Sequence, residues 1–271
     1  MRSLVNSEWL FNNLDDPNLI ILDASTETNV SKLVPKYKDV YIKGARKISK
    51  SDFVDKSNPL PNTMVGAEVF EREVRKLGVC KNSKIVVYDD LGIYNSPRIW
   101  WMFKLMGHED VAVLDGGLPD WIENEYPVAK SLSAVDHVGD FEAAYQANYF
   151  RNTEDVKRNI DSGKEVVVDA RSEGRFYGNA PEPRANLKSG HIPGSQNIPF
   201  VQLLVRGRMK NPEELKSIFG ELDQRPLVFT CGSGTTACIL MLAADQISDT
   251  SLAIYDGSWS EWGSRDDCPI M

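Results

Sequence analysis

The sequence has little of what several broad classes of function require. Its 31 lysines and arginines are outnumbered by 39 aspartates and glutamates, and the formal net charge is -8. This balance argues against broad electrostatic adhesion to nucleic acid or to an anionic membrane. No apolar run of about 18 residues occurs, and the first residues lack the apolar segment of a signal peptide. Neither nucleic acid nor a membrane is therefore expected as a partner, and the expected location is cytoplasmic.

Cysteine and histidine are scarce as well. The four cysteines, Cys80, Cys231, Cys238 and Cys268, form no C-x-x-C pair, and a chain of 271 residues does not need a disulfide framework. With only three histidines, a zinc site is not indicated either, and no metal or organic cofactor is expected. An isolated cysteine is most often a small buried apolar residue. Each thiol therefore has to be judged by its neighbours.

What the sequence does contain is an internal repeat. Four segments recur in the same order at offsets of roughly 140 to 150 residues, which is the mark of a duplicated unit. The matching pairs are LIILDAS with EVVVDARS, YIKGARKI with HIPGSQNI, KIVVYDD with PLVFTCG, and VAVLDGGLPDW with LAIYDGSWSEW. We therefore expect one domain over residues 1–128, an interdomain connection over 129–148, and a second domain over 149–271.

The hydrophobic pattern of each copy indicates an α/β fold. Short runs of Val, Ile and Leu are too short for helices and nearly continuous, as in strands that are buried on both faces of a parallel sheet. Amphipathic segments such as AEVFEREVRKLG and NPEELKSIFGEL separate them. Each domain is predicted to be a mainly parallel sheet flanked by helices, with functional residues beyond the carboxyl ends of the strands.

The candidate nucleophile is Cys231. It follows the predicted strand PLVFT and precedes GSGTT and an apolar helical segment, so that a strand, a tight loop and a helix follow in succession. Gly232 and Gly234 allow backbone conformations in which successive N–H groups converge on an anion. The positive end of a helix dipole behind the loop also favours a thiolate. Cys238, about two helical turns further on, is expected to be buried, and Cys80 and Cys268 have no such surroundings.

The first copy has Asp89 at the position that matches Cys231, followed by the longer loop DLGIYNSPR. A carboxylate cannot carry sulfur. The first domain is therefore expected to be non-catalytic, either supporting the second domain or persisting as a plain structural copy.

Taken together, CGSGTT, DARSEGRF, PEPR, GHIPGS and YDGSWSEW resemble the 3-mercaptopyruvate sulfurtransferases of the rhodanese superfamily, over nearly the whole chain. The resemblance implies two tandem rhodanese-like domains and an enzyme in which Cys231 takes sulfur from a small-molecule donor as a persulfide. It then passes the sulfur to cyanide or to a thiol acceptor, such as thioredoxin or a small thiol. Pyruvate is the implied coproduct.

The resemblance also assigns the substrate-binding residues. Two arginines that hold the substrate carboxylate and ketone in the family match Arg175 and Arg184, and a guanidinium is well suited to a carboxylate. The remaining implied positions form the loop around the transferred sulfur: Gly232, Ser233, Gly234, Thr235 and Thr236.

One departure from the family concerns a proposed serine, histidine and aspartate relay. The histidine is expected in the motif that is YIKGA here, where Tyr41 stands. A phenol is a poor base at neutral pH, so the relay is in doubt, and Tyr41 is more simply a packing residue or a hydrogen-bond donor. His191, in the matching turn of the second copy, is not expected to be catalytic.

Several alternatives stay open from the residues alone. The loop carries no charged side chain between Cys231 and Ala237, which favours 3-mercaptopyruvate over the thiosulfate dianion as donor. A cysteine phosphatase needs arginine at the end of a C-x5-R loop, where Ala237 stands, so that reaction is disfavoured. A persulfide carrier or interaction module in a sulfur relay is the non-enzymatic alternative.

Overall fold

A computed structural model describes residues 1–271, apart from residues 28 and 30 and the side chain of residue 223. The described chain divides into two compact units. Unit 1 comprises Met1–Val54, Val65–Gln146 and Arg206–Met209, and unit 2 comprises Asp55–Met64, Ala147–Val205 and Lys210–Met271. Each unit thus includes a short segment from the other half of the chain. The contiguous boundaries expected from the repeat stay a prediction, and most of the expected connection, up to Gln146, groups with unit 1.

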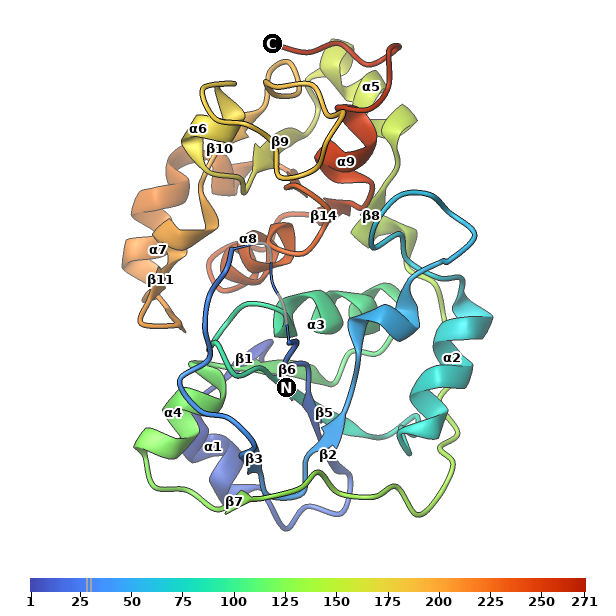
Figure 1. The fold of residues 1–271 in the computed structure, drawn as a ribbon, viewed down its shortest axis with the longest axis vertical. Helices are drawn as coiled ribbons and strands as arrows, with labels where there is room; N and C mark the ends of the chain where they lie inside the picture. The colour runs from blue at the N-terminus through green and yellow to red at the C-terminus, as the bar shows by residue number, and fades with distance from the viewer. Residues whose placement is uncertain (28, 30) are drawn as a thin grey trace. The chain divides into compact units, whose positions relative to one another are not determined.

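The main sheet of unit 1 is parallel, with strand order β1-β6-β5-β2-β4 (Figure 1). The register places Ile20 beside Ile85 and Ile85 beside Val111. The strands are β1 (Leu4–Val5), β2 (Leu19–Asp23), β4 (Arg46–Lys47), β5 (Lys84–Tyr88) and β6 (Val111–Leu114), with an antiparallel pair of β3 (Tyr41–Ile42) and β7 (Val128–Ala129). The helices are α1 (Ser7–Asn12), η1 (Lys50–Phe53), α2 (Ala67–Lys76), α3 (Ser96–Leu105) and α4 (Gly117–Glu123).

Unit 2 repeats this architecture with the parallel order β10-β9-β13-β14-β8. Its strands are β8 (Phe150–Arg151), β9 (Val166–Asp169), β10 (Gln196–Asn197), β13 (Leu227–Thr230) and β14 (Leu252–Tyr255). Its helices are η2 (Ala147–Tyr149), α5 (Thr153–Ser162), α6 (Glu173–Phe176), η3 (Phe200–Leu203), α7 (Pro212–Phe219), η4 (Gly220–Gln224), α8 (Ala237–Asp245) and α9 (Ser258–Trp262). One further short strand of unit 2 is β11 (Leu204–Val205), whereas β12 (Arg208–Met209) lies in the segment Arg206–Met209 of unit 1.

Both faces of each sheet are covered, which explains the continuous apolar runs of the central strands. In unit 1, Leu10 of α1 and Trp121 of α4 pack on one face. On the other face, Phe70 of α2 meets Phe103 of α3 edge to face. Val166–Asp169 and Leu227–Thr230 of unit 2 are buried at every position. The predicted α/β class, with two mainly parallel sheets flanked by helices, is confirmed.

The local sequence explains where the helices begin. Asn211 caps α7 by accepting a hydrogen bond from the backbone N–H of Glu214, whose side chain accepts from Asn211 N–H, and Pro212 occupies the first turn. In α2 the buried side chains are Phe70 and Val74, one turn apart, as the amphipathic pattern predicts.

Two short segments, Asp55–Met64 in unit 2 and Arg206–Met209 in unit 1, come from the other half of the chain. Each is attached to its unit by an equivalent backbone hydrogen bond. In unit 2, the backbone N–H of Met64 donates to Asp256 Oδ2 at 2.9 Å. In unit 1, the backbone N–H of Met209 donates to Asp115 Oδ1 at 2.8 Å. Asp115 and Asp256 are the matching aspartates of the repeated DG motif, so the duplication extends to how each unit holds its foreign segment.

Candidate functional site

Cys231 lies directly after β13, in the turn that leads into α8. Its side chain is buried, with 2% of the residue exposed. The loop spans residues 232–236, and Gly234 has φ of 78°, a left-handed conformation that favours glycine. Helix α8 begins at Ala237 and contains nine residues, so its positive end faces back towards this loop. The strand, loop and helix predicted around Cys231 are therefore present.

The first residues of α9 hold the start of this loop. Ser258 Oγ accepts from the backbone N–H of Cys231 at 3.3 Å and donates to the carbonyl of Tyr255 at 2.9 Å. The backbone N–H of Trp259 donates to the Cys231 carbonyl, and Ser260 donates to the Gly232 carbonyl through both its N–H and its hydroxyl. The segment YDGSWSEW is recognisable in the sequence as part of the repeat and as a family motif, but neither pattern indicates that it holds the Cys231 loop.

Both predicted arginines border the Cys231 loop. Arg184 Nη2 donates to Ser233 Oγ at 3.3 Å. A Cβ atom on Gly232 would lie only 2.9 Å from Arg175 Nη2, so this guanidinium occupies the space that a side chain at 232 would need. The structure thus brings Cys231, Ser233, Arg175 and Arg184 together within unit 2.

A buried carboxylate that the sequence analysis missed supports this arrangement. The side chain of Glu182 is 2% exposed and bonds to Arg175 Nη2 at 2.5 Å and to Arg171 Nη1 at 2.8 Å. Arg171 also pairs with Asp169 at the end of β9 and lies over the Trp259 ring, 4.1 Å from its centroid. Glu182 therefore links Arg175 to the sheet, and its place in PEPR, two residues before Arg184, was the available signal.

A second missed residue comes from the segment Asp55–Met64. Asn62 Nδ2 donates to Ser233 Oγ at 3.0 Å and to the Ser233 carbonyl at 3.1 Å. Since this segment belongs to unit 2, unit 2 is incomplete without residues that precede it by about half the chain. No pattern in the sequence placed Asn62 near the loop.

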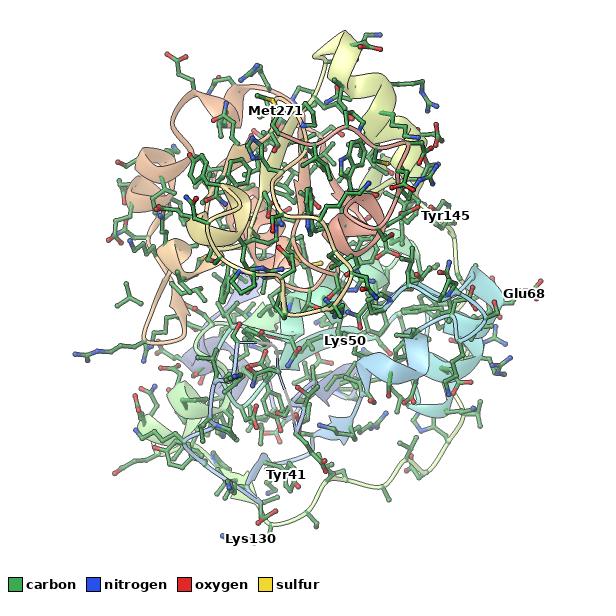
Figure 2. All side chains as sticks on the ribbon, turned by 45° about the horizontal axis from the view of Figure 1, so that its top comes forward. Tyr41, Lys50, Glu68, Lys130, Tyr145 and Met271 are labelled. Atoms are coloured by element: carbon green, nitrogen blue, oxygen red, sulfur yellow. The ribbon has the colours of Figure 1, made fainter. Side chains whose placement is uncertain are left out.

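Tyr41, which stands where the family motif is expected to carry a histidine, lies in unit 1. It is on β3, opposite Ala129 of β7 and at the same end of the unit as Lys130 (Figure 2). The side chains that hydrogen-bond to Ser233 Oγ are instead those of Asn62 and Arg184. His191 stacks on Phe176 at 3.9 Å between ring centroids, in keeping with a packing role.

In unit 1 the position that matches Cys231 holds a fully buried carboxylate. Asp89 Oδ2 accepts from the backbone N–H groups of Tyr94, Asn95 and Ser96 at 2.8–3.0 Å, and from Ser96 Oγ at 2.8 Å. Burial raises the pKa of Asp89, and the donors of Ser96 and Tyr94 oppose this rise. The loop before α3 therefore already surrounds a carboxyl group of its own.

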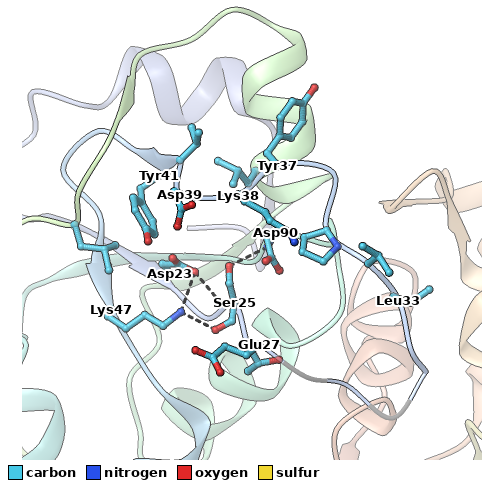
Figure 3. A pocket seen from close by; sticks show the side chains of 16 residues that line it. Asp23, Ser25, Glu27, Leu33, Tyr37, Lys38, Asp39, Tyr41, Lys47 and Asp90 are labelled. Atoms are coloured by element: carbon cyan, nitrogen blue, oxygen red, sulfur yellow. Dashed lines mark hydrogen bonds and ion pairs between the residues drawn. The ribbon is translucent and has the colours of Figure 1, made fainter.

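The strand ends of unit 1 also line a pocket of about 590 Å³ (Figure 3). Asp23 is 3.5 Å from Lys47 Nζ, and Ser25 Oγ accepts from the backbone N–H of Asp90. Burial, together with the neighbouring Asp89 and Asp23, raises the pKa of Asp90 to about 6. The carboxyl side chains of the pocket are Asp23, Glu27, Asp39 and Asp90, and its lysines are Lys38 and Lys47. Carboxylates outnumber lysines, so this pocket is poorly suited to an anionic substrate.

The other cysteines lie outside such surroundings. Cys238 is fully buried within α8, as predicted, and its thiol donates to the Gly234 carbonyl at 3.3 Å. Burial raises the pKa of Cys268, and Cys80 is partly buried in unit 1. Over the part of the chain that the structure describes, no group of three or more His, Cys, Asp or Glu side chains is arranged to hold a metal. Within the same residues, no helix combines the length and apolar character that crossing a bilayer requires.

Comparison with known proteins places this geometry in a family. The model of the rhodanese-like domain matches twice, over residues 6–124 and 152–265. Human 3-mercaptopyruvate sulfurtransferase is 38% identical, covering 97% of this chain and 93% of the human protein. The mitochondrial thiosulfate/3-mercaptopyruvate sulfurtransferase 1 of Arabidopsis thaliana is 36% identical, covering 98% of this chain and 77% of that protein.

The fold agrees as well. The crystal structure of SseA from Escherichia coli, a 3-mercaptopyruvate sulfotransferase, superposes with a TM-score of 0.83 and 31% identity, covering 96% of this chain and 100% of SseA. The two family matches fall one in each half of the repeat. The chain belongs to the rhodanese-like domain family and carries two such domains in tandem.

Proposed function

We propose that this protein is a sulfurtransferase that moves the sulfur of 3-mercaptopyruvate, through a persulfide on Cys231, to a thiol acceptor or cyanide. The observation that carries the proposal is the placement of Cys231 between the end of β13 and the loop that leads into α8, with two arginines beside this loop. Sulfurtransferase relatives that span nearly the whole chain support it.

The first half-reaction is a displacement at sulfur. The Cys231 thiolate attacks the sulfur of the donor and forms an S–S bond, while the bond between sulfur and C3 breaks and its electron pair becomes the enolate of pyruvate. A proton then adds at C3 to give pyruvate. In the second half-reaction an acceptor thiolate attacks the outer sulfur, takes it as a persulfide, and leaves Cys231 as thiolate; cyanide leaves as thiocyanate.

The chain's own residues divide this work. Arg175 and Arg184 hold the donor carboxylate and its ketone oxygen, because two fixed guanidinium groups complement a planar anion and the charge that grows on the enolate. Gly232, Gly234, Thr235 and Thr236 shape the loop around the transferred sulfur, and Ser233 supplies a hydroxyl donor. Helix α8 adds the favourable end of its dipole.

The choice of donor rests on the charge of the loop. Residues 232–236 carry no ionisable side chain, whereas the thiosulfate dianion calls for positive charge close to the nucleophile. We therefore expect 3-mercaptopyruvate to have the larger kcat/KM when each donor is tested at equal concentration with cyanide or thioredoxin. A clear preference for thiosulfate would reverse the order. Both donors need to be tested, because the name of the Arabidopsis relative includes thiosulfate as well as 3-mercaptopyruvate.

The acceptor is proposed to be thioredoxin or a small thiol, and the alternative is a carrier that hands its persulfide to a partner protein. An enzyme releases pyruvate catalytically, whereas a carrier without acceptor stops at one pyruvate per chain. The expected cytoplasmic location also stays a proposal, because one relative is named as mitochondrial.

One experiment tests donor, nucleophile and reaction class together. Donor-dependent pyruvate formation and intact mass are measured for the wild type, Cys231→Ser and Cys80→Ser. We expect the wild type and Cys80→Ser to turn over and to gain the mass of one sulfur. Cys231→Ser should lose at least about 1,000-fold in turnover, because removing a nucleophile leaves only binding contributions. Unchanged turnover in Cys231→Ser would refute the proposal.

A further inference from the structure

Two hydrogen bonds join the side-chain amide of Asn62 to Ser233. Asn62 Nδ2 lies 3.0 Å from Ser233 Oγ and 3.1 Å from the Ser233 carbonyl oxygen. A carbonyl oxygen only accepts, so the amide of Asn62 must present its nitrogen to this loop. The orientation of the Asn62 amide is thereby fixed, and Ser233 Oγ receives one of its hydrogen bonds as an acceptor.

Ser233 Oγ also accepts a hydrogen bond from the guanidinium of Arg184. Arg184 Nη2 lies 3.3 Å away, and a guanidinium has donors only. A hydroxyl has two acceptor lone pairs and one hydrogen. With both lone pairs directed at Asn62 and Arg184, the hydroxyl hydrogen is left to donate in a third direction.

The backbone at Asn62 indicates that this arrangement is built rather than incidental. Asn62 has φ of 64°, in the left-handed region where asparagine is one of the few tolerated residues besides glycine. Two residues further on, the same segment is anchored by the hydrogen bond from Met64 N–H to Asp256, which follows β14. Asn62 is therefore held against the loop by its backbone as well as by its side chain.

We propose that Asn62 is a positioning residue that, together with Arg184, fixes Ser233 as a permanent hydrogen-bond donor towards the reacting sulfur and the developing enolate. This inference rests on the proposed sulfur transfer. Because an amide does not titrate, Ser233 keeps this role at every pH at which the protein is folded, and no base removes its proton. The site thus stabilises charge at Ser233 instead of relaying a proton through it.

Two substitutions of Asn62 distinguish the effect of its side-chain amide from the effect of its backbone conformation. Asn62→Gly keeps the left-handed conformation at no steric cost and removes only the side chain. We expect kcat/KM to fall about 3- to 10-fold, which corresponds to one neutral hydrogen bond, with the loss mainly in kcat. Asn62→Asp is isosteric and also tolerates this backbone, but a carboxylate accepts the Ser233 proton and turns the hydroxyl away. Its expected loss at pH 7.5 is about 30- to 100-fold.

The decisive measurement is the pH dependence of the rate ratio between Asn62→Asp and the wild type, taken from single-turnover persulfide formation by intact mass. The ratio cancels titrations that both proteins share. It should rise as pH falls towards 5, because the introduced carboxyl becomes protonated and can donate again. A purely structural effect of the substitution would give a ratio independent of pH.

Asn58→Asp is the matched control, because it adds the same charge to the same segment. Asn58 Oδ1 accepts from the backbone N–H of Leu60, a bond that a carboxylate also makes. We expect this variant to match the wild type at every pH. Equal behaviour of Asn58→Asp and Asn62→Asp, or wild-type rates in both Asn62 variants, would overturn the positioning role. Absence of pyruvate and persulfide in the wild type would instead overturn the proposed function.

Discussion

The loops that follow β5 and β13 lie at equivalent positions of the two sheets but surround different side chains. In unit 1 the Asp89 carboxylate fills the loop and accepts four hydrogen bonds at one oxygen, from backbone and hydroxyl donors at the start of α3. In unit 2 the loop before α8 surrounds a thiol on Cys231 and is bordered by arginines. The comparison shows that one arrangement of strand, loop and helix surrounds a carboxyl group in one copy and a thiol in the other, as the residue at the strand end dictates.

The charge around the two loops differs in the same sense. The pocket at the strand ends of unit 1 is lined by more carboxylates than lysines, and Lys47 is already paired with Asp23. Arg184 of unit 2 instead donates a hydrogen bond to a neutral hydroxyl, Ser233 Oγ, at 3.3 Å. The two copies thus share one architecture but differ in the residue at the strand end, Asp89 or Cys231, and in the charged side chains nearby.

The largest expected effect comes from separating the halves. A chain of residues 149–271 contains Cys231, Arg175 and Arg184 but lacks Asp55–Met64, which belongs to unit 2. We expect pyruvate formation to fall at least about 100-fold, since Ser233 and Asp256 lose their partners in that segment. Circular dichroism checks that the fragment is folded. Full turnover by a folded fragment would show that the first half does not support the second.

The next largest effect is on the free energy of unfolding, which should depend more on Asp89 than on Cys231. Asp89→Ala leaves several buried donors without their acceptor, and we expect the free energy of unfolding to fall by about 3 kcal/mol. Cys231→Ala removes one sulfur from a buried site and should cost only about 1 kcal/mol. Urea unfolding at pH 7 measures both. Equal losses would mean that the Asp89 carboxylate is not the structural centre of its loop.

A cation in each unit tests the difference in charge. Arg184→Met should lower kcat/KM about 10- to 100-fold, because a charged hydrogen-bond donor to the substrate is lost. Lys47→Met, on the pocket of unit 1, should leave kcat/KM unchanged. Steady-state pyruvate formation with 3-mercaptopyruvate distinguishes them. A comparable loss in Lys47→Met would place part of the reaction in unit 1.

The smallest expected effect concerns pH. Because the pKa of Asp90 is raised to about 6, the folded protein binds more protons than the unfolded chain between pH 4 and 6. This group therefore lowers stability progressively as pH rises through that window. Asp90→Asn should be equal to the wild type near pH 4 and more stable by about 1 kcal/mol at pH 7, after allowance for solvent screening. A difference that does not change between pH 4 and 7 would contradict the cause given for the raised pKa.

Local sequence was a reliable guide to the fold and to the strand, loop and helix that surround Cys231. The uninterrupted apolar run before Cys231 indicates a strand buried on both faces, and the glycines and apolar helix after it indicate the turn that the structure contains. Arg175 and Arg184 were assigned by family resemblance, since an arginine in a loop has no local pattern that reveals its target. Their roles stay predictions, although both lie beside the Cys231 loop.

The neighbours of these residues were not predictable in the same way. Glu182 was an unremarked residue of PEPR until its burial between Arg171 and Arg175 appeared. Ser258 needs a turn that brings the start of α9 against β13, and Asn62 needs a segment from the other half of the chain. Neither contact follows from spacing, because hydrogen bonds between distant segments depend on how the chain returns in space.

The sequence by itself determined the duplication, the alternation of strands and helices, and the place of a thiol at a strand end. These features are periodic or local, and short-range sterics and apolar burial encode them. Tertiary structure alone decided which segment completes which unit, and which donors fill the acceptor positions of Ser233. Those contacts join residues from 49 to 192 positions apart, and only the folded chain brings them within hydrogen-bonding distance.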